Sequence, residues 1–512
     1  METIKSPTRI LIVALALGLC YDLLFHGHAL GVSLPLFVLL LVAALLWLGR
    51  SAGVRPAWRN LWLLVPLFFV AGMVAVRANA TLTFFNVAAT LALLALLAHY
   101  FAAGRLERSG LVGYALAGLR SGANALFQAA PLVKEALARR SAPTATRRNA
   151  WPLVRGLLLA LPVLAVFTCL LSSADLVFGR YVANLLGLRF WQELVGRALV
   201  VLLAAWLLAG ALAYSLRRGS GDSQGGIDRA LDSLAVALRP STPPAEDGLQ
   251  RLLAALAGIL GFGMVEAAIV LLAVDLLFAA FVGIQFAYLF GGQANVTAQG
   301  YTYAEYARRG FFELVSVAVL ALGLGLGLRW LTRRETPRQS LAFSALSSLL
   351  GGLVLVMLAS AFQRLRLYEL AYGFTETRLS VYVFMVWLGA ALAWFVVTLW
   401  RLPNRFAVGA LVAALGFLVT LNAINPDAFV ARRNLERYYA GAELDAAYLT
   451  RLSDDAVPVL LEAVGRTSGG EQSILERELG TRRALAAAEA AQQGWPAWHL
   501  ARWRAYTLLI DN

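Results

Sequence analysis

Cysteine and histidine are rare in this chain of 512 residues, which has two cysteines and four histidines. Cys20 and Cys169 both lie in apolar segments, so we expect no disulfide framework. His26 and His28 lie close together, but no further ligand is near them, and the pair alone has too few ligands for a zinc site. The sequence therefore predicts no metal site.

Charged residues are also scarce. They make up 14% of the chain, whereas 60% of the residues are hydrophobic. A soluble domain has about 25% charged and roughly 45–50% apolar residues. A globular core cannot hide such an excess of apolar side chains, but a lipid bilayer can solvate them. The composition therefore indicates a membrane protein with the bilayer as its main partner.

Basic side chains outnumber acidic ones, and the formal net charge is +14. These residues sit at the ends of apolar segments, as membrane topology signals do, and are not gathered on one soluble face. We therefore expect no nucleic-acid partner. Nearly all of them are arginine, and abundant alanine, leucine and glycine accompany them. This composition is typical of a GC-rich bacterial genome, so the expected location is a bacterial inner membrane.

Familiar catalytic motifs are missing as well. The chain has no P-loop, no HExxH, no GxSxG nucleophile elbow and no protein-kinase motif set. These motifs carry the phosphate, metal and nucleophile chemistry of many ATPases, kinases and hydrolases. We therefore expect no cofactor, and the sequence does not support a cytoplasmic ATPase or protease.

What the chain does have is a train of about eleven apolar segments, each near the length of about 20 residues that crosses a bilayer as a helix. The predicted fold is therefore an all-α, polytopic helical membrane domain over residues 1–422. The spans are expected at 10–25, 30–48, 61–76, 81–99, 152–172, 196–215, 255–285, 310–328, 341–361, 379–400 and 406–422.

Arginine-rich loops follow every second span, and such loops stay in the cytoplasm. This predicts a cytoplasmic N-terminus and an extracytoplasmic C-terminus. Two cytoplasmic connections are long, near 101–150 and 217–250, and part of the first can form an amphipathic helix on the membrane surface. The stretch 252–290 fits one long helix or two short spans. One helix is favoured, because two would reverse the charge rule downstream.

The last part of the chain, residues 423–512, is charged and soluble in character. Its apolar residues recur at helical spacing, as in Tyr448, Leu449 and Leu452. This spacing predicts a small, all-helical extracytoplasmic domain. Ser453, followed by two aspartates, has the pattern of a helix N-cap.

Polar residues gather at the outer ends of the later spans. Because charged groups near a bilayer need partners, we expect arginine–carboxylate pairing between these stretches. In a helix, Gln363, Arg366 and Glu369 would share one face, and Tyr368 and Tyr372 another. The candidate outer-face residues are Asp175, Gln285, Tyr303, Glu305, Arg308, Arg309, Gln363, Arg364, Arg366, Tyr368, Glu369, Arg378, Asn425, Asp427, Arg432, Asn434 and Arg437.

These blocks carry a family resemblance. The stretches YAEYARRGFFEL, FQRLRLYELAYGFTETRL and NPDAFVARRNLER, with LSSADLVFG as a weaker fourth, resemble a bacterial membrane-protein family known as domain of unknown function 4173 and its relative 4153. The resemblance covers most of the chain. It implies a polytopic membrane protein with an outward polar face, and it implies no activity.

Two readings of the outer polar residues stay open. They form either a structural network that locks helix ends and docks the C-terminal domain, or a site for an anionic lipid or lipid-linked ligand, which arginine suits. Acidic residues inside spans are functional candidates by default, and here they are Asp22, Glu266 and Asp275.

The first functional hypothesis is an envelope-associated structural or ligand-sensing role without chemistry of its own. One alternative is a membrane enzyme that acts on a lipid-linked substrate, with an architecture like that of polytopic glycosyltransferases and with Asp175 or Asp427 as acid or base. Another is a proton-coupled secondary transporter that uses Glu266 and Asp275.

Overall fold

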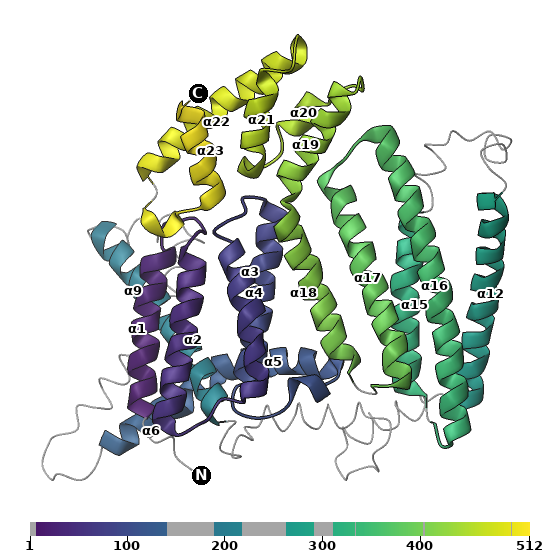
Figure 1. The fold of residues 1–512 in the computed structure, drawn as a ribbon. Coiled ribbons are helices and arrows are strands. Elements are labelled where there is room, and N and C mark those ends of the chain that lie inside the picture. Colours follow the sequence, from purple (N-terminus) through teal and green to yellow (C-terminus); the bar gives the residue numbers. More distant parts are fainter. Residues whose placement is uncertain are drawn as a thin grey trace, which may run out of the picture.

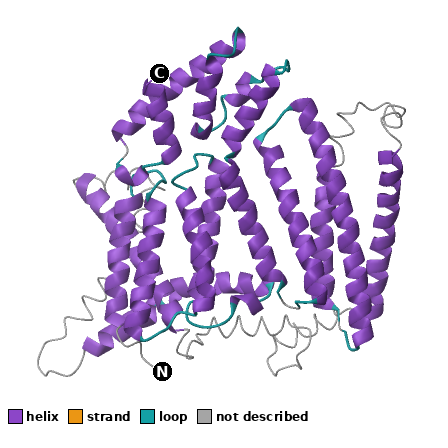
Figure 2. Ribbon diagram, in the orientation of Figure 1, coloured by secondary structure: helices purple, strands orange, loops and turns teal. Residues whose placement is uncertain are grey.

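The computed structural model describes residues 7–140, 189–217, 263–290, 311–332, 334–402, 405–492 and 494–511. Over these ranges every regular element is a helix, which confirms the predicted all-α class (Figure 2).

Nine of the described helices are long and apolar enough to cross a membrane. They correspond to nine of the predicted spans. They are α1 (Pro7–Phe25), α2 (Ser33–Ala52), α4 (Ala80–Tyr100), α9 (Arg189–Arg217), α12 (Met264–Phe290), α15 (Phe311–Leu331), α16 (Pro337–Tyr372), α17 (Glu376–Trp400) and α18 (Phe406–Ile424).

The other two predicted spans have different outcomes. The span at 61–76 is a shorter apolar helix, in which the 3-10 turn η1 (Trp58–Leu63) runs into α3 (Leu64–Met73). The span at 152–172 lies outside the described residues. For the stretch 252–290, the described part from Met264 onward is one continuous helix, as the charge rule favoured.

The spanning helices pack in three neighbouring groups, which follow one another across Figure 1. Buried apolar side chains join α1 and α2 to α9, then α2, α3 and α4 to α18, and then α12 and α15 to α16 and α17. Local signals start some of these helices. Thr336 and Gln339 form a capping box at the start of α16, and the Thr375 side chain caps α17.

Three further helical elements lie at the end of the bundle where α1 begins. They are η2 (Leu106–Arg108) followed by α5 (Leu111–Phe127), and α6 (Ala129–Arg140). Figure 1 shows α5 running across the ends of the spans, and it packs on α4 and α9. The predicted helix within 101–150 is therefore present, while its contact with a membrane surface stays a prediction.

The C-terminal helices lie at the opposite end, which we call the C-terminal side (Figure 1). They are α19 (Pro426–Tyr439), α20 (Ala446–Leu449), η4 (Asp454–Ala456), α21 (Val457–Val464), α22 (Gly470–Gln492), η5 (Trp495–Ala497) and α23 (Leu500–Asp511). Their buried apolar core includes Val430, Leu460 and Leu475, and Leu379 of α17 joins it. The C-terminal helices therefore share their core with a span.

A single residue joins the last span to the C-terminal helices. Asn425 has a left-handed backbone, with φ of 58°, and Pro426 begins α19 directly after it. Asparagine tolerates this conformation better than most residues, and proline suits the first turn of a helix. The predicted boundary between 422 and 423 falls in the last turn of α18, and the division into two domains stays a prediction.

Candidate functional site

Polar side chains from four parts of the chain meet where the C-terminal helices rest on the spans. We call this the junction cluster, and it consists of Arg77, Asn79, Glu376, Asp427, Ser453 and Asp455. Arg77 and Asn79 come from the short loop between α3 and α4, Glu376 starts α17, Asp427 is in the first turn of α19, and the other two come from Ser453 onward, where η4 begins.

Asp455 binds the loop between α3 and α4. Its carboxylate accepts a hydrogen bond of 2.6 Å from the main-chain N–H of Ala78. The Arg77 guanidinium lies 3.5 Å from the same carboxylate, and the Asn425 amide donates to it at 3.3 Å. Asp455 is only 7% exposed. A buried carboxylate of this kind needs such donors, so the contacts fix η4 against the spans.

Asp427 is the centre of the cluster and is fully buried. It accepts hydrogen bonds from the Asn79 amide at 3.0 Å and from the main-chain N–H of Ser453 at 3.1 Å, and the Ser453 hydroxyl donates to it as well. The Asn79 amide also donates to Glu376 at 2.8 Å. The Asn79 amide therefore bridges the two carboxylates.

The cluster continues into the span region through amide side chains. Asn86 of α4 and Asn422 of α18 exchange two hydrogen bonds, of 3.0 and 2.8 Å, and both are fully buried. The Arg77 Nε donates to the Asn422 carbonyl at 2.9 Å. These bonds satisfy polar groups that would otherwise be costly between apolar helices.

Burial changes the acid–base properties of the groups on the C-terminal side. It raises the pKa of Asp455, while the Ala78 N–H and the Arg77 charge act in the opposite direction. Burial also raises the pKa of the Tyr448 hydroxyl, which accepts a hydrogen bond from the Glu376 N–H at 3.0 Å. Both shifts reflect the loss of water around the charged form. In the described ranges no group of three His, Cys, Asp or Glu is placed to hold a metal ion.

A second contact joins α19 to the turn between α16 and α17. The Asn434 amide exchanges two hydrogen bonds of 2.9 Å with the main chain of Phe374. Arg437 donates to the carbonyls of Leu370 and Ala371, which end α16. Gly373 has a φ of 78°, and a Cβ there would lie 2.2 Å from the Arg437 guanidinium, so the turn requires glycine.

The predicted outer-face residues that the structure describes belong to the later parts of α12 and α16, the first turn of α17, the joint at Asn425 and α19. α16 stays helical to Tyr372, and the Tyr368 and Tyr372 rings are 5.0 Å apart, as the spacing predicted. Arg378 lies over the Tyr368 ring, and Tyr382 donates to Glu369 at 3.2 Å. Asp175, Tyr303, Glu305, Arg308 and Arg309 lie outside the described residues.

The remaining predicted residues do not join the junction cluster. Gln363 and Arg366 are exposed on α16, and Arg432 is exposed on α19. Arg364 is half-buried on α16. Gln285 of α12 accepts a hydrogen bond from Ser360 of α16.

Three acidic residues in the spans have different surroundings. Asp22 of α1 is buried and pairs with Arg197 of α9 at 2.7 Å. Glu266 is exposed in the first turn of α12. Asp275, near the middle of α12, is 2% exposed, and neither carboxylate oxygen has a hydrogen-bond partner among the residues that the structure describes.

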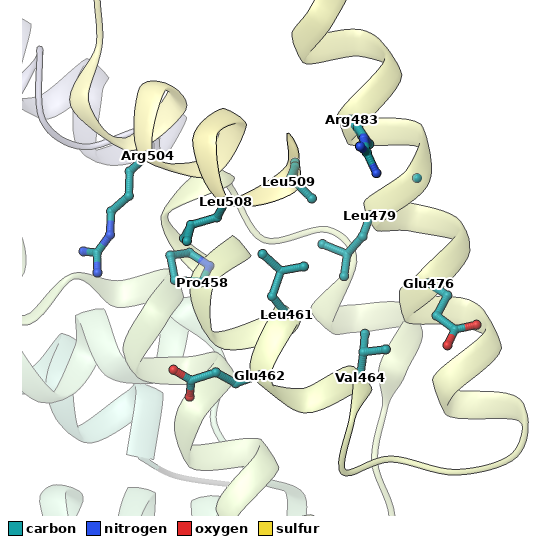
Figure 3. A pocket seen from close by; sticks show the side chains of 11 residues that line it. Pro458, Leu461, Glu462, Val464, Glu476, Leu479, Arg483, Arg504, Leu508 and Leu509 are labelled. Carbon is teal, nitrogen blue, oxygen red and sulfur yellow. The ribbon is translucent and has the colours of Figure 1, made fainter. Parts of the chain in front are cut away.

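The C-terminal helices also form a groove of about 670 Å³ between α21, α22 and α23 (Figure 3). Its inner surface is apolar, and side chains of both charges surround it. This gives the groove no preference for an anionic over a cationic ligand. The residues that line it include Leu461, Val464, Leu479, Leu508, Leu509, Glu462, Glu476, Arg483 and Arg504.

Sequence reasoning singled out only Asp427 of the junction cluster as an outer-face residue and missed the other five. Arg77 and Asn79 stand in a loop too short to attract notice, and Asp455 was assigned to a helix N-cap. Ser453 does cap η4, but it also bonds to Asp427. Two features of the sequence could have indicated the cluster. One is Arg77 in an otherwise apolar outer loop, and the other is the pair Asn86 and Asn422 inside spans.

The comparisons with known proteins agree with this architecture. Residues 64–463 match a protein family described as a domain of unknown function (DUF4153). The chain belongs to this family. The match is to the second of the two related families that the sequence blocks resemble, and the first, 4173, is not shown. No curated protein and no solved structure matches the chain.

The matched region of the DUF4153 member runs from α3 into α21. It therefore includes the whole junction cluster, from Arg77 to Asp455. The family sequence pattern spans both the helices that cross the bilayer and the part of the C-terminal helices that contacts them.

Proposed function

We propose that this protein is a scaffold of the bacterial inner membrane, whose spans hold the C-terminal helices in a fixed position at the extracytoplasmic surface. The observation that carries the proposal is the complete burial of Asp427 of α19 among donors from the loop between α3 and α4 and from the segment before η4. Buried polar networks with satisfied partners make a contact specific as well as stable.

The same observation weighs against the alternative of a membrane enzyme that acts on a lipid-linked substrate with Asp427 as its acid or base. A catalytic acid or base has to come within hydrogen-bond distance of a substrate. Asp427 has no exposed surface, and its oxygens already bind Asn79 and Ser453. This favours a structural role for Asp427.

The scaffold role is tested by replacing Asp427 with alanine and measuring hydrogen–deuterium exchange of the full-length protein in nanodiscs. The expected result is faster exchange over residues 446–511, with unchanged exchange in the spans. Glu443→Ala is the control, because Glu443 is an exposed carboxylate on the same side. Unchanged exchange in the Asp427 variant would refute the scaffold proposal.

A second candidate function, proton-coupled transport, rests on Asp275. Its carboxyl is buried in a membrane span and has no hydrogen-bond partner within the described ranges, which is costly, and such groups often take part in proton relays. In proteoliposomes, a proton flux that the wild-type protein carries and Asp275→Asn abolishes would support this function. If the wild-type protein carries no proton flux, transport of this kind is ruled out.

A further inference from the structure

The segment from η5 into α23 carries three exposed tryptophans. Trp495 is 61% exposed, Trp498 is 45% exposed and Trp503 is 53% exposed. Such large aromatic surfaces are costly in water, and together they mark a surface that meets a partner. The three tryptophans are not part of the junction cluster.

Main-chain contacts fix this segment at the level where the spans end. The Val32 N–H, at the start of α2, donates to the Trp498 carbonyl at 2.9 Å. The Leu500 N–H donates at 2.8 Å to the carbonyl of Ala75, which lies just after α3. A Cβ on Gly31 would lie 2.4 Å from the Trp498 carbonyl oxygen, so the two chains touch directly. Figure 1 shows α23 rising from the ends of α1 and α2.

The aromatic segment also continues an apolar surface that already faces lipid. Leu19 and Leu23 in the last turns of α1 are 56% and 60% exposed, and Leu30 in the loop to α2 is 40% exposed. On a spanning helix such exposed leucines face the bilayer. Because Gly31 and Val32 touch Trp498, the lipid-facing surface of α1 and α2 passes directly into the three tryptophans.

The segment has the chemistry of a membrane–water interface. Tryptophan has an apolar ring and one N–H donor, and it concentrates at the headgroup level of membrane proteins. A groove of about 300 Å³ lies between α22 and η5–α23, and Arg502 lines it together with the three tryptophans. Arginine binds phosphate through its planar guanidinium.

We propose that η5 and the first turn of α23 lie in the headgroup layer of the leaflet on the C-terminal side, where Trp495, Trp498 and Trp503 insert between phospholipids and Arg502 binds a lipid phosphate. The bilayer is thus a second support of the C-terminal helices, separate from the junction cluster. The tryptophans hold the side of the C-terminal helices that rests on α1 and α2, and the junction cluster holds the side next to α4 and α17.

The test uses full-length protein with Cys20 and Cys169 replaced by serine, and with a single bimane label on Trp495→Cys or Trp503→Cys. Ser473→Cys on the exposed first turn of α22 is the aqueous control, and Leu40→Cys, exposed on α2, is the lipid control. Each variant is reconstituted in nanodiscs of phosphatidylethanolamine and phosphatidylglycerol. Quenching by a nitroxide lipid is then compared with quenching by aqueous iodide.

The expected result is a loss of fluorescence at positions 495 and 503 on addition of the nitroxide lipid, as at position 40 and unlike at position 473. Quenching by iodide alone at both positions would overturn the proposal. Protection from both quenchers would overturn it too, because a protein partner would then cover the tryptophans.

The lipid phosphate is tested separately with a nitroxide on the phosphatidylglycerol headgroup. Arg502→Gln is expected to reduce quenching at position 503, whereas Arg504→Gln leaves it unchanged, because Arg504 lies beside the other groove (Figure 3). Equal quenching in the two arginine variants would refute the role of Arg502. Unchanged thermal unfolding of each labelled protein shows that the labels have not displaced the C-terminal helices.

Discussion

Replacing Asp455 with alanine removes the carboxylate that binds the loop between α3 and α4. The N–H of Ala78, which now donates to Asp455 at 2.6 Å, would lose its acceptor. An unsatisfied buried donor costs about 1–3 kcal/mol. The contacts with Arg77 and Asn425, at 3.5 and 3.3 Å, are longer and add about 1 kcal/mol.

One effect opposes this loss. Burial raises the pKa of Asp455, which means that the ionised carboxylate is partly destabilised by desolvation. Alanine removes that penalty, so we expect a net loss of about 2 kcal/mol in the free energy of unfolding of the C-terminal helices. Burial is thus a cost that the donors around Asp455 have to outweigh.

The neighbouring residue Asp454 gives a matched control. Its side chain is 36% exposed and its ion pair with Arg482 has a distance of 3.5 Å, so Asp454→Ala is expected to cost at most about 0.5 kcal/mol. Urea titrations of both variants in detergent micelles give the comparison. Equal unfolding midpoints for the two variants would refute our account of the junction cluster.

Three further predictions concern other contacts on the C-terminal side. Burial, with the Arg502 charge, lowers the pKa of His499 to about 4, so its contribution to stability is complete above pH 6.5 and falls by about 3 kcal/mol as the pH drops toward 4. Unfolding of His499→Gln should lack this pH dependence, and an identical pH profile in the variant would exclude it. Gly373→Ala should lower the unfolding free energy by about 2 kcal/mol, because of its positive φ and the contact with Arg437. A melting temperature equal to that of the wild-type protein would contradict this. Asp22→Asn and Arg197→Gln should each lower the melting temperature. The double variant should be no less stable than the less stable of the two single variants, because both substitutions remove the same ion pair. Additive losses would show that the pair does not interact.

Much of the fold could be predicted because spans depend on local composition. A run of about 20 apolar residues has to be helical in a bilayer, whatever its neighbours are. The charge rule also favoured the single helix that begins at Met264. The span at 61–76 was harder, because Pro66 and the 3-10 turn that begins at Trp58 shorten the α-helix.

The junction cluster was less predictable because its partners are far apart in sequence. Asn79 and Asp427 are separated by 348 residues, and no local pattern indicates that they meet. Charge alone drew attention to Arg366 and Arg432, which are exposed. The residues that build the contact are mainly short polar ones, and their role depends on burial that only the packed helices create.

The single residue between α18 and α19 also has a mechanical consequence. Asn425 is followed at once by Pro426, whose ring fixes its own backbone angle, so the joint has few freely rotating bonds. Asp455 bonds to this joint through the Asn425 side chain and to the neighbouring loop through Ala78. A tilt or axial shift of α18 would therefore move α19 together with it as one rigid body. The last span sets the angle at which the C-terminal helices stand on the membrane.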